Sequence, residues 1–417
     1  MKVNTDIDQN RTKQAILLED QYGAHNYHPL PVVLEKGKGV FVWDVEGNKY
    51  YDFLSAYSAV NQGHCHPKII ESLKHQAEKL TLTSRAFYNS ELGKAEKYIC
   101  EYFGFNKVLL MNTGAEANET AIKLARKWGY QKKLIPENRA RIVAVSNNFH
   151  GRTTTIISAS TDSLSTNEFG PFMPGFDVIP YNDLVAAEKA LVKSDICGMW
   201  VEPIQGEAGV NVPDDGYLQG LSDLCRKNNV LLMMDEVQTG IGRTGKLLAA
   251  DYENVRPDIL ILGKALSGGV YPVSAVLADD EVMLTIKPGE HGSTFGGNPI
   301  ASAVMMASLE VIENENLIEN AHSMGIIFRD RMNKLVDRSD LVQLIRGKGL
   351  LNAIVINDDE SSNTAWELCL GLMKNGLLAK PTHGNIIRFA PPLIINEEQL
   401  DACCTIIEKT VLNFEKK

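Results

Sequence analysis

The middle of the chain contains short apolar runs at regular intervals, and this rhythm constrains the fold more than any other feature. Six such runs lie at residues 108–111, 142–145, 198–201, 230–234, 259–262 and 273–277. Stretches with the pattern of helices or loops separate most of them. Strands that are apolar on both faces and joined by crossovers are typical of a mostly parallel sheet covered by helices. The sequence therefore predicts an α/β fold.

The two ends of the chain follow a different pattern. After about Pro299, long helices are predicted at 301–312, 317–335, 364–374 and 397–414, with brief strands near 350–356 and 386–389. Residues 32–54 alternate around glycine-containing turns, which indicates a small antiparallel meander, and a helix follows at 67–80. We expect a large domain over residues 50–310 and a smaller α+β domain made of residues 1–49 and 311–417.

Composition narrows the partners that the chain can have. The formal net charge of −10 disfavours a nucleic acid or an acidic membrane, so a small anionic substrate would need local Arg or Lys groups. Seven scattered cysteines without a C-x-x-C pair are typical of reduced thiols. Residues 1–20 resemble neither a signal peptide nor a transit peptide, and no apolar run approaches bilayer length. We expect a cytoplasmic protein that acts on small molecules.

A glycine-rich segment at residues 240–245 matches G-x-G-x-x-G after an apolar strand, the dinucleotide-binding pattern. With Lys246 it nearly matches a P-loop, but Leu247 stands where a magnesium-binding hydroxyl is needed. Asp235 and Glu236 lie between the strand and the glycines, where they would repel a pyrophosphate. The better interpretation is a glycine-rich loop that turns away from the end of a strand.

A second segment, residues 112–119, directly follows the predicted strand 108–111 and opens a helix. Free backbone N–H groups and the positive end of the helix dipole suit one phosphate group at such a position. Simple capping of the helix by Thr113 or Asn112 explains the same residues equally well. The segment alone leaves both interpretations open.

A lysine and an acid follow two of the predicted strands. Lys264 follows residues 259–262 after Gly263, and Asp235 directly follows the run at 230–234. A lone lysine is most often solvated, but open sheets bind their ligands at the carboxyl ends of the strands. A lysine that forms a Schiff base, an acid that keeps a pyridine nitrogen protonated and a phosphate site on a third strand together fit pyridoxal 5′-phosphate (PLP).

Longer motifs carry a family resemblance along nearly the whole chain. The stretch 232–240 together with Gly263 and Lys264 resembles the signature of the class III (subgroup II) PLP-dependent aminotransferases of fold type I. Supporting stretches lie at residues 53–64, 202–209, 292–299, 378–384 and 387–392. The resemblance implies an aminotransferase with a mostly parallel central sheet in its large domain and a smaller α+β domain.

The resemblance also assigns the residues that hold the cofactor. It implies that Lys264 forms the Schiff base and moves the proton, and that Asp235 pairs with the pyridine nitrogen. The other implied contacts are Gln238 to the ring hydroxyl, the N–H groups of Gly114 and Ala115 to the phosphate, and Phe149 stacked on the ring. Plain core packing is the alternative for Phe149. Thr294 would reach the phosphate of the neighbouring subunit, which implies a homodimer with active sites at its interface.

For substrates, the resemblance implies that the δ-amino group of L-ornithine passes to 2-oxoglutarate. The products would be glutamate and glutamate 5-semialdehyde, which cyclises to pyrroline-5-carboxylate. Arg388 would bind the α-carboxylate of glutamate or 2-oxoglutarate, and Glu207 would neutralise Arg388 when ornithine is bound. Tyr27 and Arg152 would hold the ornithine carboxylate end, and Tyr57 would shape the pocket for its α-amino group. A structural salt bridge and ordinary packing are the alternatives.

Other interpretations remain open at this stage. His64, Cys65 and His66 lack further ligands in a plausible array, so no metal site is expected, and we expect His150 to be non-catalytic. N-acetylornithine or 4-aminobutyrate are alternative amino donors. An isomerase of the same fold, or a protein that binds NAD or ATP through residues 240–245, are alternatives of other classes.

Overall fold

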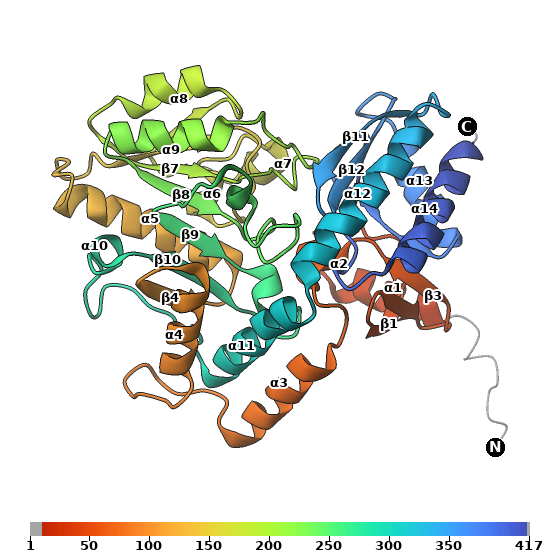
Figure 1. Cartoon of the computed structure of the whole chain (residues 1–417), viewed down its shortest axis with the longest axis horizontal. Helices are drawn as coiled ribbons and strands as arrows, with labels where there is room; N and C mark the ends of the chain where they lie inside the picture. The colour runs from red at the N-terminus through yellow and green to blue at the C-terminus, as the bar shows by residue number, and fades with distance from the viewer. Residues whose placement is uncertain (1–10, 415–417) are drawn as a thin grey trace.

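The computed structural model describes residues 11–414. The chain forms a large body around a central sheet and a smaller body that contains both described ends of the chain (Figure 1). The interpretation of residues 1–20 as lacking a targeting segment falls in its first half on residues 1–10, which lie outside the described residues. Within residues 11–414, no helix is both long and apolar enough to cross a bilayer.

Within the described residues, the largest sheet has seven strands in the order β4-β10-β9-β8-β7-β5-β6. Their bounds are β4 Lys107–Met111, β5 Arg141–Val145, β6 Phe176–Ile179, β7 Ile196–Val201, β8 Leu231–Asp235, β9 Ile259–Leu262 and β10 Ser274–Ala278. Strands β5 to β9 pair in parallel, whereas β10 is antiparallel to both β4 and β9. The α/β fold with a mostly parallel sheet is confirmed.

Helices cover both faces of this sheet, which explains why its strands are continuous apolar runs. In β8, Met233 packs into the layer of helix α5 (Gly114–Gln131), while Met234 packs into the layer of α8 (Leu184–Leu191) and α9 (Tyr217–Lys227). Successive side chains of a strand point to opposite faces, so both faces must be apolar. Helices α3 (Pro67–Lys79), α4 (Leu92–Phe103) and α11 (Pro299–Asn314) extend the large body beside β4 (Figure 1).

The smaller body combines segments from the two ends of the chain. One sheet joins β1 (Leu34–Lys38), β2 (Phe41–Asp44) and β3 (Lys49–Asp52) to β13 (Leu377–Leu378), which pairs in parallel with β3. The other sheet has the order β11-β12-β15-β14, with bounds β11 Val342–Lys348, β12 Leu351–Ile356, β14 Lys380–Pro381 and β15 Ile386–Phe389. Helices α12 (Leu317–Val336), α13 (Thr364–Lys374) and α14 (Glu397–Leu412) pack around them, and α1 (Arg11–Tyr22) lies nearby.

The glycine-rich loop at residues 240–245 is a packed turn between the two bodies. Its Arg243 is fully buried and donates hydrogen bonds to Asn61 Oδ1 and to the carbonyl oxygens of Leu350 and Pro391. A Cβ atom at Gly245 would lie 2.8 Å from the backbone of His322 in α12. Because the loop is filled by its own buried arginine and by α12, it offers no room for a dinucleotide or for a P-loop phosphate.

Candidate active site

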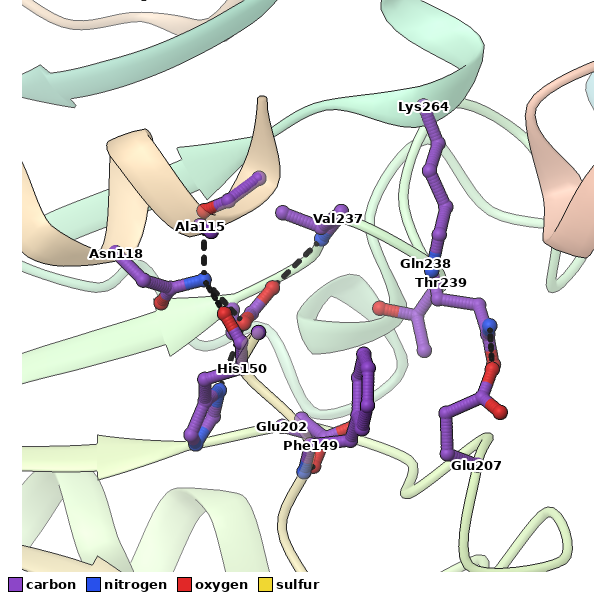
Figure 2. Close-up of a pocket in the computed structure, with 13 residues that line it drawn as sticks. Ala115, Asn118, Phe149, His150, Glu202, Glu207, Val237, Gln238, Thr239 and Lys264 are labelled. Carbon is purple, nitrogen blue, oxygen red and sulfur yellow. Dashed lines mark hydrogen bonds and ion pairs between the residues drawn. The ribbon is translucent and has the colours of Figure 1, made fainter. Parts of the chain in front are cut away.

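A cavity of about 170 Å³ lies at the carboxyl ends of β4, β5, β7, β8 and β9 (Figure 2). Open parallel sheets bind their ligands at this edge. The residues that line the cavity come from the segments following these strands: Gly114, Ala115, Asn118, Phe149, His150, Gly151, Glu202, Glu207, Asp235, Val237, Gln238, Thr239 and Lys264. Of the thirteen, seven are predicted site residues: Lys264, Asp235, Gly114, Ala115, Phe149, Gln238 and Glu207.

Lys264 enters the cavity from a strained backbone position. It begins the short 3-10 helix η2 (Lys264–Ser267) directly after β9, and its φ of +46° lies in the left-handed region that side chains other than glycine rarely adopt. Burial lowers the pKa of Lys264, and Arg388 lowers it further, although Glu207 and Asp235 act in the opposite direction. The lowered pKa raises the fraction of neutral amine available near neutral pH.

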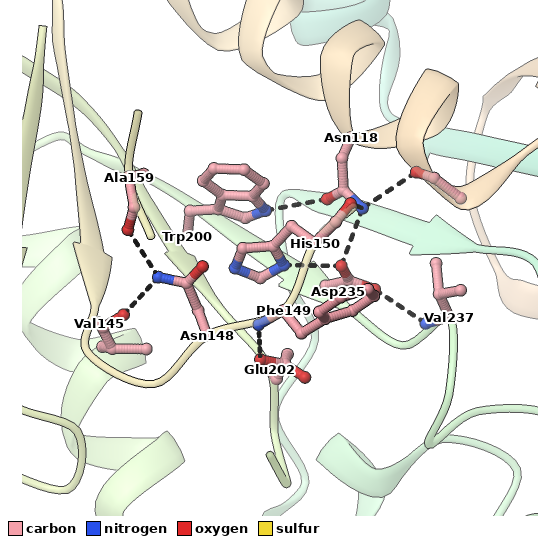
Figure 3. A network of polar contacts seen from close by, with 11 residues as sticks. Asn118, Val145, Asn148, Phe149, His150, Ala159, Trp200, Glu202, Asp235 and Val237 are labelled. Atoms are coloured by element: carbon pink, nitrogen blue, oxygen red, sulfur yellow. Dashed lines mark hydrogen bonds and ion pairs between the residues drawn. The ribbon is translucent and has the colours of Figure 1, made fainter. Parts of the chain in front are cut away.

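Asp235 ends β8 and is held by a closed network of hydrogen bonds (Figure 3). Its Oδ2 accepts from Asn118 Nδ2 at 2.8 Å and lies 2.7 Å from His150 Nδ1, while its Oδ1 accepts from the Val237 N–H at 3.0 Å. The His150 ring stacks on Trp200 with centroids 3.8 Å apart, and Trp200 Nε1 donates to Asn118 Oδ1. The carboxylate is therefore fixed in one orientation inside a buried site.

Three residues of this network are absent from the predicted site. His150, which is expected from the sequence to be non-catalytic, lines the cavity and contacts Asp235. Because it touches Asp235 and not the reacting atoms, it is a positioning residue. Asn118 and Trp200 complete the network, and the signal that could have found Asn118 is a buried polar residue within the apolar stripe of α5.

The beginning of α5 combines capping with an open anion site. Thr113 caps the helix: its Oγ1 accepts from the Glu116 N–H at 3.2 Å, and the Thr113 N–H donates to Glu116 Oε2 at 2.9 Å. Gly114 and Ala115 are the first two helical residues, so their N–H groups have no acceptor within the helix. Both interpretations of this segment are therefore compatible, with Thr113 as the cap and the next two N–H groups free to bind a phosphate.

Phe149 faces the cavity, and a hydrogen bond from its backbone holds it in place (Figure 2). Its N–H donates to Glu202 Oε2 at 2.9 Å. Burial raises the pKa of Glu202 well above its usual range, and the nearby Asp235 raises it further, whereas the Phe149 N–H lowers it. Arg152 is exposed and its guanidinium lies 5.6 Å from the centre of the Phe149 ring.

Arg388 and Glu207 form a buried ion pair at the other end of the cavity. Arg388, on β15 of the smaller body, is 2% exposed, and its Nη1 donates to Glu207 Oε1 at 2.8 Å. Burial raises the pKa of Glu207, but Arg388 and Lys264 together lower it to about 2. The Nε of Arg388 is buried without an acceptor among residues 11–414, so one donor remains for a ligand.

Gln238, which lines the cavity together with Lys264 and Asp235, contacts both members of the ion pair of Arg388 and Glu207. Its Nε2 donates to Glu207 Oε1 at 2.9 Å, and its Oε1 lies 3.3 Å from Arg388 Nη1. Gly206 makes the close approach possible, since a Cβ atom there would stand 1.5 Å from Gln238 Oε1. The side chain assigned to the ring hydroxyl is thus also a partner of the ion pair.

The remaining predicted site residues lie around or outside the cavity. The ring of Tyr57 lies 5.2 Å from the Arg388 guanidinium. Burial raises the pKa of Tyr57; Glu207 and Tyr27 raise it further, whereas Arg388 and Arg152 lower it. Tyr27 is 71% exposed, and Thr294 is exposed on a loop that does not line the cavity of its own chain.

The histidine pair that the sequence singles out does not form one cluster. His64 pairs with Asp52 and His66 pairs with Glu315. Among the described residues, no group of three or more His, Cys, Asp or Glu side chains is arranged to hold a metal ion.

Comparisons with known proteins agree with this geometry. The family described as aminotransferase class III matches residues 22–411. The mitochondrial ornithine aminotransferase of Rattus norvegicus is 62% identical over 95% of this chain and 90% of its own. Among solved structures, an ornithine aminotransferase from Toxoplasma gondii superposes with a TM-score of 0.95 at 49% identity, covering 97% of this chain and 95% of its own. One titled acetylornithine aminotransferase, from Elizabethkingia anophelis, has a TM-score of 0.89 at 60% identity and covers 97% and 99%.

Proposed function

The chain belongs to the class III aminotransferase family, and from this premise we propose that it transfers the δ-amino group of L-ornithine to 2-oxoglutarate with PLP as its cofactor. The products are glutamate and glutamate 5-semialdehyde, which cyclises to pyrroline-5-carboxylate. The observation that carries the proposal is the buried pair of Arg388 and Glu207 beside Lys264, with one donor of Arg388 left for a ligand. The similarity to the rat and Toxoplasma proteins supports the same substrate.

The residues of the cavity fit PLP. The N–H groups of Gly114 and Ala115, at the positive end of the α5 dipole, would hold the phosphate. Asp235, fixed by three donors, would hold the protonated ring nitrogen, and Phe149 would cover one face of the ring. Lys264 would attach to the cofactor's aldehyde carbon. When bound, PLP withdraws electrons from the carbon that carries the transferred amino group.

Lys264 then acts as the proton carrier of the reaction. Because its pKa is lowered, its amine is available in the neutral form that can take a proton from the δ-carbon of the donor. The carboxylate of Asp235 would keep the ring nitrogen of bound PLP protonated. Burial of the site excludes water from these proton transfers.

Glu207 and Arg388 allow one pocket to accept substrates of different charge. With a donor that lacks a carboxylate at this end, Glu207 neutralises Arg388 within the pair at 2.8 Å. With 2-oxoglutarate or glutamate, the guanidinium pairs with the substrate's α-carboxylate instead, and its free Nε donor completes a two-point contact. At the opposite end of the donor, Tyr57, Tyr27 and Arg152 would bind the α-amino and α-carboxylate groups of ornithine.

N-acetylornithine is the second candidate donor, because the Elizabethkingia protein, 60% identical to this chain, is named an acetylornithine aminotransferase. The experiment is an absorbance titration of the PLP-loaded protein with L-ornithine, N-acetylornithine and 4-aminobutyrate, each without acceptor. We expect ornithine to bleach the visible band of the bound cofactor and 2-oxoglutarate to restore it. Bleaching by either other donor in place of ornithine would contradict the substrate assignment.

Replacing Lys264 by Ala tests the role on which the mechanism depends. We expect Lys264→Ala to abolish turnover, because no other side chain of the cavity offers an amine to the reacting carbon. The measurement is steady-state glutamate formation together with the visible spectrum. Near-wild-type activity in this variant would contradict the assignment.

We further propose that the active unit is a homodimer. The exposed Phe87 and Tyr88 lie in a loop that approaches the loop of Phe295, since a Cβ atom at Gly297 would meet Arg85 at 3.2 Å. Large exposed apolar side chains in adjoining loops favour a protein interface, and Thr294 in the same region would reach the partner's phosphate site. The mass in solution tests this, with Tyr88→Glu expected to shift dimer toward monomer.

We also propose limits for the two domains and a cellular compartment for the protein. We propose a large PLP-binding domain over residues 50–310 and a small one made of residues 1–49 and 311–417. The pairing of β3 with β13 supports a small domain built from both ends of the chain, and it places Tyr51 and Asp52 in that domain as well. We propose the cytoplasm as the location because all seven cysteines are free. The rat and Drosophila relatives are named mitochondrial, so fractionation of cells that express the full chain is the deciding measurement.

A further inference from the structure

The segment that carries Tyr57 has an unusual backbone. Four consecutive residues, Ser55, Ala56, Tyr57 and Ser58, have φ values of +48°, +46°, +59° and +72°, and none of them is glycine. Side chains disfavour this left-handed region because the Cβ atom approaches the carbonyl oxygen. A run of four such residues persists only where the surroundings hold it in place.

Asp52, the last residue of β3, holds the start of this turn. Its Oδ1 accepts hydrogen bonds from the N–H groups of Leu54 and Ser55, both at 2.9 Å. Its Oδ2 lies 2.7 Å from Nε2 of His64. Since the carboxylate can only accept, Nε2 of His64 is the donor. One carboxylate therefore connects the turn to a histidine that follows it along the chain.

His64 is itself held from two sides. Its N–H donates to the carbonyl of Gly39 at 2.8 Å, and its carbonyl accepts from the Gly39 N–H at 3.0 Å. Its ring lies against β1 at Gly37, where a Cβ atom would stand 2.9 Å from the ring atoms. Gly37 is thus the residue that leaves room for the imidazole. The histidine has both an anchor on the β1–β2 turn and a partner on the turn of Tyr57.

The turn is also joined to the strand that supplies Arg388. The carbonyl of Phe53 accepts from the N–H of Ala390 at 2.7 Å, two residues beyond Arg388. The Tyr57 ring lies 5.2 Å from the Arg388 guanidinium. The position of Tyr57 relative to Arg388 therefore depends on how the turn leaves Asp52.

We propose that His64 is a positioning residue that acts through Asp52 to hold the left-handed turn and so to set Tyr57 in the donor-binding end of the site. This inference rests on the proposed function. Recognition of the amino donor depends on Tyr57, whereas the carboxylate of 2-oxoglutarate is held by Arg388 directly. Loss of the His64 contact therefore affects the donor more than the acceptor.

The test compares His64→Leu with His64→Gln in the PLP-loaded protein. Leu removes the donor to Asp52, and Gln can restore it. We expect His64→Leu to raise the KM for L-ornithine roughly tenfold to a hundredfold, since a misplacement of about 1 Å can cost up to about a hundredfold. The KM for 2-oxoglutarate, kcat and the cofactor's visible band should change little, and His64→Gln should recover most of the loss. His66→Gln is the matched control, because His66 pairs with Glu315 and not with the turn.

A double substitution separates positioning from a general structural role. In a Tyr57→Ala background, His64→Leu should raise the KM for ornithine no further, because the side chain that it positions is gone. An equal additional rise in that background, or an equal loss with both substrates and in the cofactor band, would overturn the proposal. Gly37→Ala is the milder variant should His64→Leu fail to fold, and we expect the same donor-selective change from it.

The same measurements also distinguish failure of the proposed donor substrate from failure of the proposed role of His64. Bleaching of the wild-type protein by N-acetylornithine or 4-aminobutyrate, and not by ornithine, would show that the proposed substrate is wrong. The comparison of His64→Leu with His64→Gln would then be made with the donor that reacts, and the absence of a donor-selective KM change would overturn the role of His64.

Discussion

The two ends of the cavity differ in how the chain assembles them. At the cofactor end, Asp235 ends one strand of the large sheet, His150 and Lys264 follow two others, and α5 supplies Asn118. At the substrate end, Glu207 comes from the large body, Arg388 from β15 of the smaller one and Tyr57 from the turn after β3. A single sheet fixes its strand ends relative to one another, whereas three separate segments can shift independently.

This difference between the two ends indicates which part of the cavity can change its substrate specificity. We expect the cofactor end, whose residues are joined by one sheet and its hydrogen-bond network, to serve every substrate in the same way. We expect small displacements at the substrate end to change which donor is accepted. This agrees with similar structures that carry different substrate names, such as the ornithine aminotransferase of Toxoplasma gondii and the acetylornithine aminotransferase of Elizabethkingia anophelis.

The largest expected effect lies at the cofactor end. Asp235→Asn removes the negative charge that keeps the ring nitrogen protonated, so both half-reactions should slow by roughly 10³-fold, as when a group that stabilises developing charge is lost. The measurement is the single-turnover rate with ornithine and, separately, with 2-oxoglutarate. A loss confined to one substrate would break the distinction between the two ends.

The next effect tests the substrate end. Glu207→Gln removes the charge that neutralises Arg388, so the free guanidinium should favour substrates with a carboxylate there. We expect kcat/KM for ornithine to fall about tenfold to a hundredfold, which corresponds to the loss of one charge-assisted contact. Glutamate should become the better donor relative to ornithine in the same assay. An equal fall for both donors would show that Glu207 does not discriminate between them.

A smaller effect on both substrates is expected from the network behind Asp235. His150→Phe keeps a ring that can stack on Trp200 but removes the hydrogen bond to Asp235. We expect both half-reactions to slow by about tenfold, the size of one lost hydrogen bond to a charged group. Retention of PLP on dialysis should also weaken. His150→Asn, which can still donate to the carboxylate, is the matched comparison and should lose less.

The smallest effect concerns stability and not activity. Glu236 follows Asp235 but faces Thr239 and the Ala250 N–H, and burial raises its pKa to about 7. Because the folded pKa lies above the ordinary value of 4.5, ionisation destabilises the fold as the pH rises from about 4.5 to 7, by about 3 kcal/mol in all. Glu236→Gln should therefore raise the melting temperature at pH 8 and leave it nearly unchanged at pH 4.5. Equal shifts at both pH values would contradict this.

The sequence predicts the large sheet well because its strands are buried on both faces. Strand β9 coincides with the predicted run 259–262, and β4 begins one residue before the run at 108–111. Four described strands have no predicted counterpart. Strand β6 is partly exposed, β11 carries Gln343, Arg346 and Lys348, and β13 and β14 have only two residues each. The antiparallel direction of β10 is also invisible, since a buried strand is apolar on both faces whichever way it runs.

The residues of the site also differ in how well the sequence predicts them. The positions of Lys264 and Asp235 after apolar runs suggest their roles from the residues alone. By contrast, 181 residues separate Glu207 from Arg388, so the pair could be expected only from the family resemblance. The left-handed turn at residues 55–58 has no glycine to signal it, and its support by Asp52 and His64 depends on the folded chain.

The parallel pairing of β3 with β13 has a consequence for synthesis on the ribosome. Leu377 is translated 326 residues after its partner Tyr51 (377 − 51). At roughly 5–20 residues per second, the first strands wait about 16–65 s for that partner. All strands of the seven-stranded sheet are complete by Ala278, so this sheet can form during the wait. All predicted cofactor-binding residues of the chain's own cavity, from Gly114 to Lys264, are therefore translated before the strand that carries Arg388.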